Sequence, residues 1–161
     1  MKNERNLYAR KAVTLLKEKE LTVSFAESCT GGMVAETITT IPGASEVFEL
    51  GVVTYGSNMK VKLLGIPNEL ISEKGVVSRE VAEAMANGIR RLASSTYGIG
   101  ITGVAGPGPS DGHPEGEIFI SLSGPEGTVT KRLFTETINK REYNRQKAVE
   151  IAFSLLLENI K

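Results

Sequence analysis

The chain has 161 residues, 40% of them hydrophobic, and its 19 basic side chains balance its 19 acidic ones. This length suits one domain with one core, so we predict a single domain over residues 1–161. The balanced charge argues against nucleic acid or a membrane as partner, and no apolar run reaches the ~18–20 residues that a membrane span needs. A single cysteine and a charged N-terminus without an apolar signal segment favour a reducing, cytoplasmic location.

Helices and strands alternate through the first part of the chain. Residues 3–20 combine leucine and valine with lysine, arginine and glutamate, which is typical of an amphipathic helix. A strand is predicted over 22–26 and a helix over 31–39. The run 47–55 is rich in β-branched and aromatic residues and predicts a buried strand, and a short helix follows over 59–64.

The second part begins with Ser78, the expected N-cap of a long helix over 79–95. The core-facing stripe of that helix is predicted to hold Val81, Met85, Ile89 and Leu92. A strand over 97–102 then leads into a loop of glycine and proline, 103–116.

The chain is predicted to end with a hairpin, over 117–123 and 128–135, and a last helix over 141–160. Strands therefore alternate with helices first, and a hairpin comes late. This order predicts an α/β fold, a three-layer α/β/α sandwich with a mixed, mostly parallel sheet.

A serine lies where the first strand is expected to turn into a helix. Ser28 stands there with Cys29 and Thr30, and Gly31 and Gly32 follow. Backbone N–H groups point outward at such a turn, and glycines let a ligand oxygen approach them closely. A hydroxyl at this place is either a nucleophile whose oxyanion the amides bind, or an ordinary helix N-cap. The stretch alone leaves both interpretations open.

Three stretches follow predicted strands, where open α/β folds bind ligands: 27–32, 55–60 and 102–107. The third suits backbone contact with a phosphate or a planar ring, and equally a plain surface turn. No Ser-His-Asp triad is convincing, because His113 lies in the glycine-rich loop and is expected to be exposed. Lys60 is the alternative base for a serine, since burial lowers the pKa of a lysine readily, although most lysines are solvated surface charges.

Five motifs in the same order resemble the CinA C-terminal domain family over residues 22–156. They are AESCTGG at 26–32, VVTYxxxxK at 52–60, LLGI at 63–66, GVVSREVAEAM at 75–85 and TGVAGPG at 102–108. The resemblance implies an amidohydrolase that converts nicotinamide mononucleotide to nicotinate mononucleotide and ammonia. It also implies a homo-oligomer whose partner is a small-molecule nucleotide. The chain looks like the stand-alone form of the family, without the N-terminal domain of the longer proteins.

The family's motifs assign roles to residues of this chain. Ser28 resembles the nucleophile, Lys60 its base with Tyr55 beside it, and Thr102 a group that orients the pair or the substrate. The amides of Thr30 and Gly31 would bind the oxyanion, so neither metal nor cofactor is expected. The residues expected to contact substrate are Glu27, Cys29, Thr30, Gly31, Gly32, Gly103, Ala105, Gly106, Arg141 and Arg145, where either arginine would pair with the phosphate.

Two departures from the family pattern keep other functions open. The serine and asparagine that usually follow the tyrosine stand one place later here, as Ser57 and Asn58. The loop at 108–116 lacks the family's Lys-Pro-Val-Gly run. The alternatives are a nucleotide-binding module without catalysis, and an amidase or esterase that acts on another small molecule.

Overall fold

The computed structural model describes residues 2–136 and 138–161 and contains one five-stranded sheet. Its strands are β1 (Val23–Glu27), β2 (Phe48–Val53), β3 (Tyr97–Gly103), β4 (Ile118–Gly124) and β5 (Gly127–Leu133), in the spatial order β2-β1-β3-β4-β5. Both β2 and β3 lie parallel to β1, whereas β4 is antiparallel to its neighbours β3 and β5. The sheet is therefore mixed, and β4 is the strand that runs against the others.

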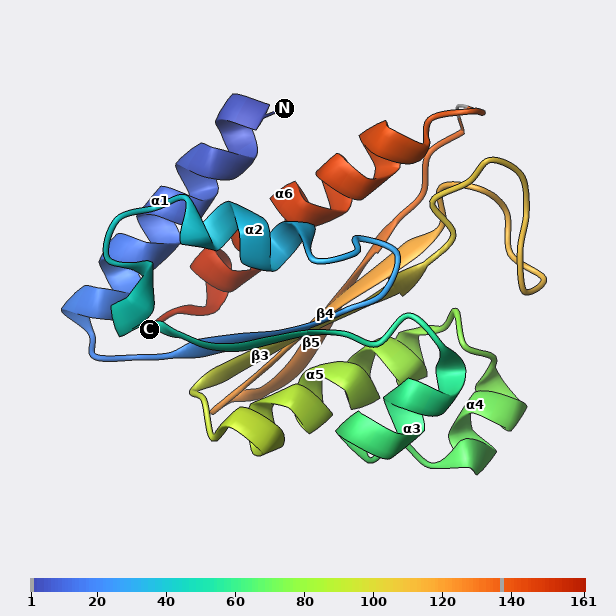
Figure 1. Ribbon diagram of the computed structural model, residues 1–161, viewed down its shortest axis with the longest axis horizontal. Coiled ribbons are helices and arrows are strands. Elements are labelled where there is room, and N and C mark those ends of the chain that lie inside the picture. The colour runs from blue at the N-terminus through green and yellow to red at the C-terminus, as the bar shows by residue number, and fades with distance from the viewer. Residues whose placement is uncertain (1, 137) are drawn as a thin grey trace.

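Helices cover both faces of this sheet (Figure 1). One layer holds α1 (Lys2–Glu18), α2 (Met33–Thr39) and α6 (Arg141–Asn159). The other holds α3 (Ser57–Leu64), α4 (Asn68–Lys74) and α5 (Arg79–Ala93). The predicted three-layer α/β/α sandwich is confirmed.

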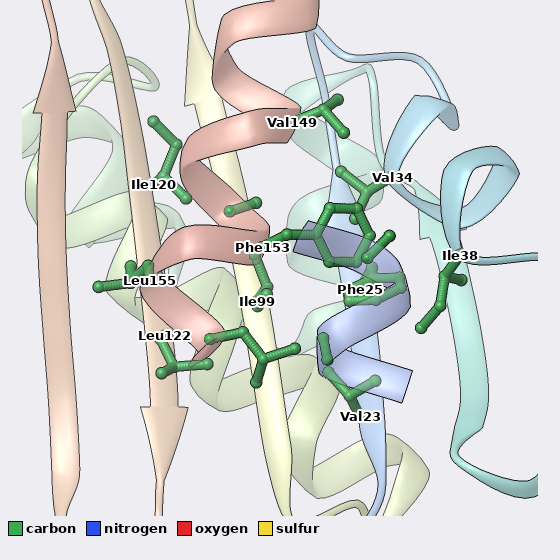
Figure 2. Packing of buried hydrophobic residues seen from close by; sticks show 14 of the residues in the cluster. Val23, Phe25, Val34, Ile38, Ile99, Ile120, Leu122, Val149, Phe153 and Leu155 are labelled. Atoms are coloured by element: carbon green, nitrogen blue, oxygen red, sulfur yellow. The ribbon is translucent and has the colours of Figure 1, made fainter. Parts of the chain in front are cut away.

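The larger core lies between the sheet and the layer of α1, α2 and α6. Figure 2 shows Phe153 of α6 beside Phe25 of β1, with their ring centroids 6.1 Å apart in an edge-to-face arrangement. Phe25 also stacks on Phe48 of β2 at 5.1 Å. Aromatic pairs in these geometries add to the free energy of burial, so they fix β1 and its neighbour β2 beneath the helices.

On the other face α5 packs unusually close to the sheet. A Cβ at Gly98 would meet the carbonyl oxygen of Ala86, and a Cβ at Gly100 would meet that of Ala82. The glycines of β3 therefore let the helix backbone rest on the strand. Ser78 caps α5 by accepting a hydrogen bond from the Val81 N–H at 3.2 Å, as predicted.

Two expectations about these elements were wrong, and one helix was missed. The run 47–55 is not a buried strand: β2 is an edge strand whose residues alternate between half-buried and exposed. Leu92 does not face the core and is 49% exposed, because α5 turns the alanines beside Val81 and Met85 toward the strand instead. The helix α4 was not predicted.

Candidate active site

The carboxyl ends of β1, β2 and β3 meet at one edge of the sheet, because these three strands are parallel. The stretches 27–32, 55–60 and 102–107 follow those ends. Together with the loop after β3 they enclose a cleft of about 470 Å³. Ser28, Lys60 and Thr102 all line it, although they are far apart in the sequence.

Ser28 and Lys60 form a direct pair in this cleft. The Lys60 Nζ donates to Ser28 Oγ at 3.0 Å. It also donates to the carbonyl oxygen of Thr54 at 2.6 Å and to that of Tyr55 at 3.5 Å. These bonds fix the amine against the hydroxyl, since the first turn of α3 places Lys60 directly beneath the end of β2.

Lys60 is almost fully buried, with 1% of its surface exposed. Burial lowers the pKa of its ammonium to about 8, because the charged form loses its hydration. Asp111, which also lines the cleft, acts in the opposite direction and raises that pKa. A lysine of this kind is partly neutral near physiological pH and can accept a proton from a hydroxyl.

The turn after Ser28 is held by a carboxylate from below. Glu27 is buried and accepts hydrogen bonds from the N–H groups of Gly32 at 3.0 Å and Ala35 at 2.9 Å. The structure therefore places Glu27 behind the cleft, with both oxygens occupied by backbone. The Gly31 N–H donates to the Ser28 carbonyl at 3.0 Å and is therefore already occupied. The predicted oxyanion donors, the amides of Thr30 and Gly31, are thus not both available.

Of the two residues that follow Ser28, Cys29 lines the cleft, whereas Thr30 is fully buried outside its lining. Among the described residues the Cys29 N–H donates to no backbone carbonyl and has only its own thiol in reach. Cys29 follows Ser28 directly, where an oxyanion formed by attack of the Ser28 hydroxyl would need a donor. The thiol of Cys29 is 6% exposed, and burial raises its pKa to about 12, so it is not a nucleophile at neutral pH.

Arg141 and Arg145 lie one turn apart on α6 but face different surroundings. Arg141 is exposed and lines the cleft, where it donates to the carbonyl oxygen of Gly106 and to the Tyr55 hydroxyl at 3.4 Å. Arg145 lies outside the cleft lining and donates to the carbonyl oxygens of Cys29 at 3.1 Å and Thr30 at 3.0 Å. Arg145 thereby ties the turn after Ser28 to α6, whereas Arg141 can reach a ligand in the cleft.

The segment after β3 forms the opposite wall. Thr102 donates its hydroxyl proton to the Val76 carbonyl at 2.8 Å, which leaves its oxygen able to accept a bond. Gly103, Ala105 and Gly106 line the cleft with backbone. Glu115 ties this wall to α6 by accepting from the N–H groups of Gly108 at 2.8 Å and Lys140 at 2.9 Å.

Sequence reasoning overlooked Asn144 and Asp111 at this site and left the role of Ser57 open. Asn144 is fully buried and donates to the Ala105 carbonyl at 3.0 Å, and Ser57 and Asp111 line the cleft. The dipeptide Asp111-Gly112, a common turn signal, could have indicated that the loop folds back on itself. His113 is half-buried, lies outside the cleft lining and bonds the Glu117 carboxylate at 2.7 Å through Nδ1.

The described residues contain neither a metal centre nor a membrane-spanning helix. No group of three or more histidine, cysteine, aspartate or glutamate side chains is arranged to hold a metal ion there. In the same residues no helix is both long enough and apolar enough to cross a bilayer.

The family model of the CinA C-terminal domain matches residues 6–160. A CinA-like protein of Prochlorococcus marinus is 46% identical over 134 residues, which are 81% of this chain and 31% of that protein. One of Solibacter usitatus is 42% identical over 147 residues, 91% of this chain and 35% of that one. The chain thus spans about a third of the length of these relatives.

Solved structures share the whole fold. The competence/damage inducible protein CihA of Agrobacterium tumefaciens superposes with a TM-score of 0.91 at 32% identity, over 96% of this chain and 94% of that one. A competence-damaged protein (CinA) superfamily protein of Klebsiella pneumoniae gives 0.90 at 27% identity, over 97% of both chains. These neighbours bear out the mixed α/β sandwich.

Proposed function

The chain belongs to the CinA C-terminal domain family, and from this premise we propose that it hydrolyses the carboxamide of nicotinamide mononucleotide to nicotinate mononucleotide and ammonia. The observation that carries the proposal is the 3.0 Å contact between the buried amine of Lys60 and the hydroxyl of Ser28. Burial favours the neutral form of a lysine, which can act as a base, and mere binding of a nucleotide needs neither residue.

The first half of the reaction follows from this contact. The neutral amine of Lys60 can direct its two N–H bonds to the carbonyl oxygens of Thr54 and Tyr55 and its lone pair to Ser28. It then accepts the hydroxyl proton of Ser28 while Oγ forms a bond to the carboxamide carbon, and the C=O electron pair moves onto the oxygen. We assign stabilisation of this oxyanion to the N–H group of Cys29, which follows Ser28 and lines the cleft. As the C=O bond re-forms and the C–N bond breaks, the Lys60 ammonium returns the proton to the leaving nitrogen, which departs as ammonia.

The second half releases the acid. Water attacks the acyl ester on Ser28, and Lys60 removes a proton from that water as it did from the hydroxyl. The ester C–O bond breaks, Ser28 recovers its proton, and nicotinate mononucleotide leaves. The residues supply each proton transfer, so the two halves balance without a cofactor.

The nucleotide part of the substrate fits the other side of the cleft. Arg141 presents a guanidinium there, the group best suited to bind phosphate oxygens with two parallel hydrogen bonds. We assign the phosphate to Arg141 rather than Arg145, because three acceptors already occupy Arg145. Tyr55, 64% exposed at the cleft, offers a ring face to the nicotinamide or the ribose.

The test is ammonia release from nicotinamide mononucleotide by the wild type and by the Ser28→Ala and Lys60→Ala variants. Both variants are expected to lose at least about 10³-fold in kcat while they still bind the nucleotide. Arg91→Ala is the control: it removes an exposed cation in the last turn of α5, outside the cleft lining.

Each failure points to a different function. A folded wild type that binds the nucleotide but releases no ammonia would support a binding module. A wild type that hydrolyses other amides or esters, but not this one, would support a different small-molecule substrate. Full turnover by Ser28→Ala would exclude both hydrolase proposals.

A further inference from the structure

The charges of the cleft are unevenly distributed around the proposed substrate. Of the described residues that line it, Lys60 and Arg141 are cationic and Asp111 alone is acidic. Nicotinamide mononucleotide carries a dianionic phosphate and, through its ring nitrogen, a cationic pyridinium. Arg141 accounts for the phosphate and the Ser28–Lys60 pair for the amide, which leaves the positive charge of the ring without a partner among these residues.

Asp111 is held in place by a tight turn at the tip of the loop after β3. Ser110 and His113 exchange backbone hydrogen bonds of 3.0 and 2.9 Å, and the two residues between them, Asp111 and Gly112, have φ of 52° and 76°. Two positive φ angles are typical of the type I′ hairpin turn, for which Asp-Gly is a preferred sequence. The Ser110 hydroxyl also donates to Asp111 Oδ2 at 3.0 Å, so the carboxylate has a defined orientation.

The base of this hairpin is anchored to the body of the protein. Glu117 is buried and contacts His113 at 2.7 Å and Arg132 at 2.7 Å. Glu115 binds the backbone of Gly108 and Lys140, as described above. The tip that carries Asp111 is therefore preorganised against the cleft, which lowers the entropic cost of using it to bind a ligand.

The field of Asp111 extends to the reacting groups. Its carboxylate favours the protonated form of Lys60 against the stronger effect of burial. A cationic ring bound beside Lys60 would disfavour the protonated form of that lysine, since like charges repel. A carboxylate at the rim of the cleft offsets that repulsion.

We propose that Asp111 is the counter-charge for the pyridinium ring, so that the site selects cationic, N-substituted pyridinium carboxamides over uncharged analogues. This inference rests on the proposed function and adds the charge of the ring to what the site recognises. The reduced nucleotide, in which the ring is an uncharged dihydropyridine, is the discriminating ligand: it keeps the carboxamide, ribose and phosphate and lacks the positive charge.

The experiment measures Kd by titration calorimetry for oxidised and reduced nicotinamide mononucleotide. Both are titrated into a Ser28→Ala protein, which prevents turnover, and into Ser28→Ala/Asp111→Asn. We expect Asp111→Asn to weaken the oxidised nucleotide about fivefold, the upper range for a solvent-exposed ion pair, and to change the reduced one less than twofold. Glu126→Gln removes one carboxylate outside the cleft and is the matched control.

Equal weakening of both ligands would overturn the inference, because it would mean that Asp111 binds the ribose or only shapes the loop. Unchanged binding of both would overturn it as well. In either case ammonia release by the wild type would still stand, so the proposed function survives. If the wild type neither binds nor hydrolyses the oxidised nucleotide, the proposed function itself fails and the inference falls with it.

Discussion

Raising the pH from 7 to 9 is expected to increase kcat/KM for nicotinamide mononucleotide about tenfold, because the proposed base is the neutral amine of Lys60. Burial lowers the pKa of this residue to about 8. A single group with that pKa is about one-tenth neutral at pH 7 and about nine-tenths neutral at pH 9. Since the ammonium loses its proton as pH rises, activity increases through about pH 8 and levels off above it.

The assay follows initial ammonia release at half-unit pH steps, at substrate concentrations far below KM, because kcat/KM reports the pKa of the free enzyme. Cys29 cannot produce the same rise, since burial raises the pKa of its thiol to about 12. Circular dichroism at each pH controls for loss of the fold. A flat profile between pH 7 and 9, or the same rise in the residual activity of Lys60→Ala, would refute Lys60 as the base.

Three further predictions follow from the packing around the cleft. Arg141→Ala is expected to raise KM at least about tenfold with little change in kcat, which is the usual effect of losing a charged hydrogen bond to the ligand. Arg145→Ala is expected instead to lower Tm and kcat, because it removes two hydrogen bonds to the turn after Ser28. Kinetics and thermal melts of both variants test this, and a similar rise in KM for both would contradict it. Gly100→Ala is expected to reduce the free energy of unfolding in urea by ~1–3 kcal/mol, because its Cβ would meet a backbone carbonyl of α5, and an unchanged midpoint would argue against that close packing. Cys29 is expected to resist iodoacetamide at pH 8 until the protein is unfolded, which mass spectrometry detects; rapid alkylation of the native protein would be inconsistent with its burial.

Most of the fold could be predicted from the sequence because local patterns and element order agree. Alternation of strands and helices followed by a late hairpin is sufficient to indicate a mixed sheet between two helical layers. The errors arose where composition carries no information on position. The apolar residues of β2 do not reveal that it forms an edge, and α4 is a short helix whose N-terminal neighbour Pro67 offers no side-chain cap.

The sequence could predict only those parts of the candidate site that follow directly after strands. Ser28 and Lys60 were expected together because each follows a parallel strand, and the structure places their polar atoms 3.0 Å apart. Arg141 and Arg145 could not be distinguished, since residues four apart share one face of a helix. Their different partners depend on the loops that pack against α6. Asp111 was overlooked because its position depends on how a 14-residue glycine-rich loop, 103–116, folds over the cleft.

Two carboxylates explain how glycine-rich segments can hold such a site rigidly. Glu27 binds the backbone amides of Gly32 and Ala35, and Glu115 those of Gly108 and Lys140. The pKa of Glu115 lies below its usual value because those backbone N–H groups stabilise its charged form. Glycines give the chain the backbone conformations that the cleft needs and let a ligand approach the backbone closely, but they also make the chain flexible. The carboxylates reduce that flexibility by binding the amides on either side. The segments around the cleft are thus positioned by acidic residues that lie outside its lining.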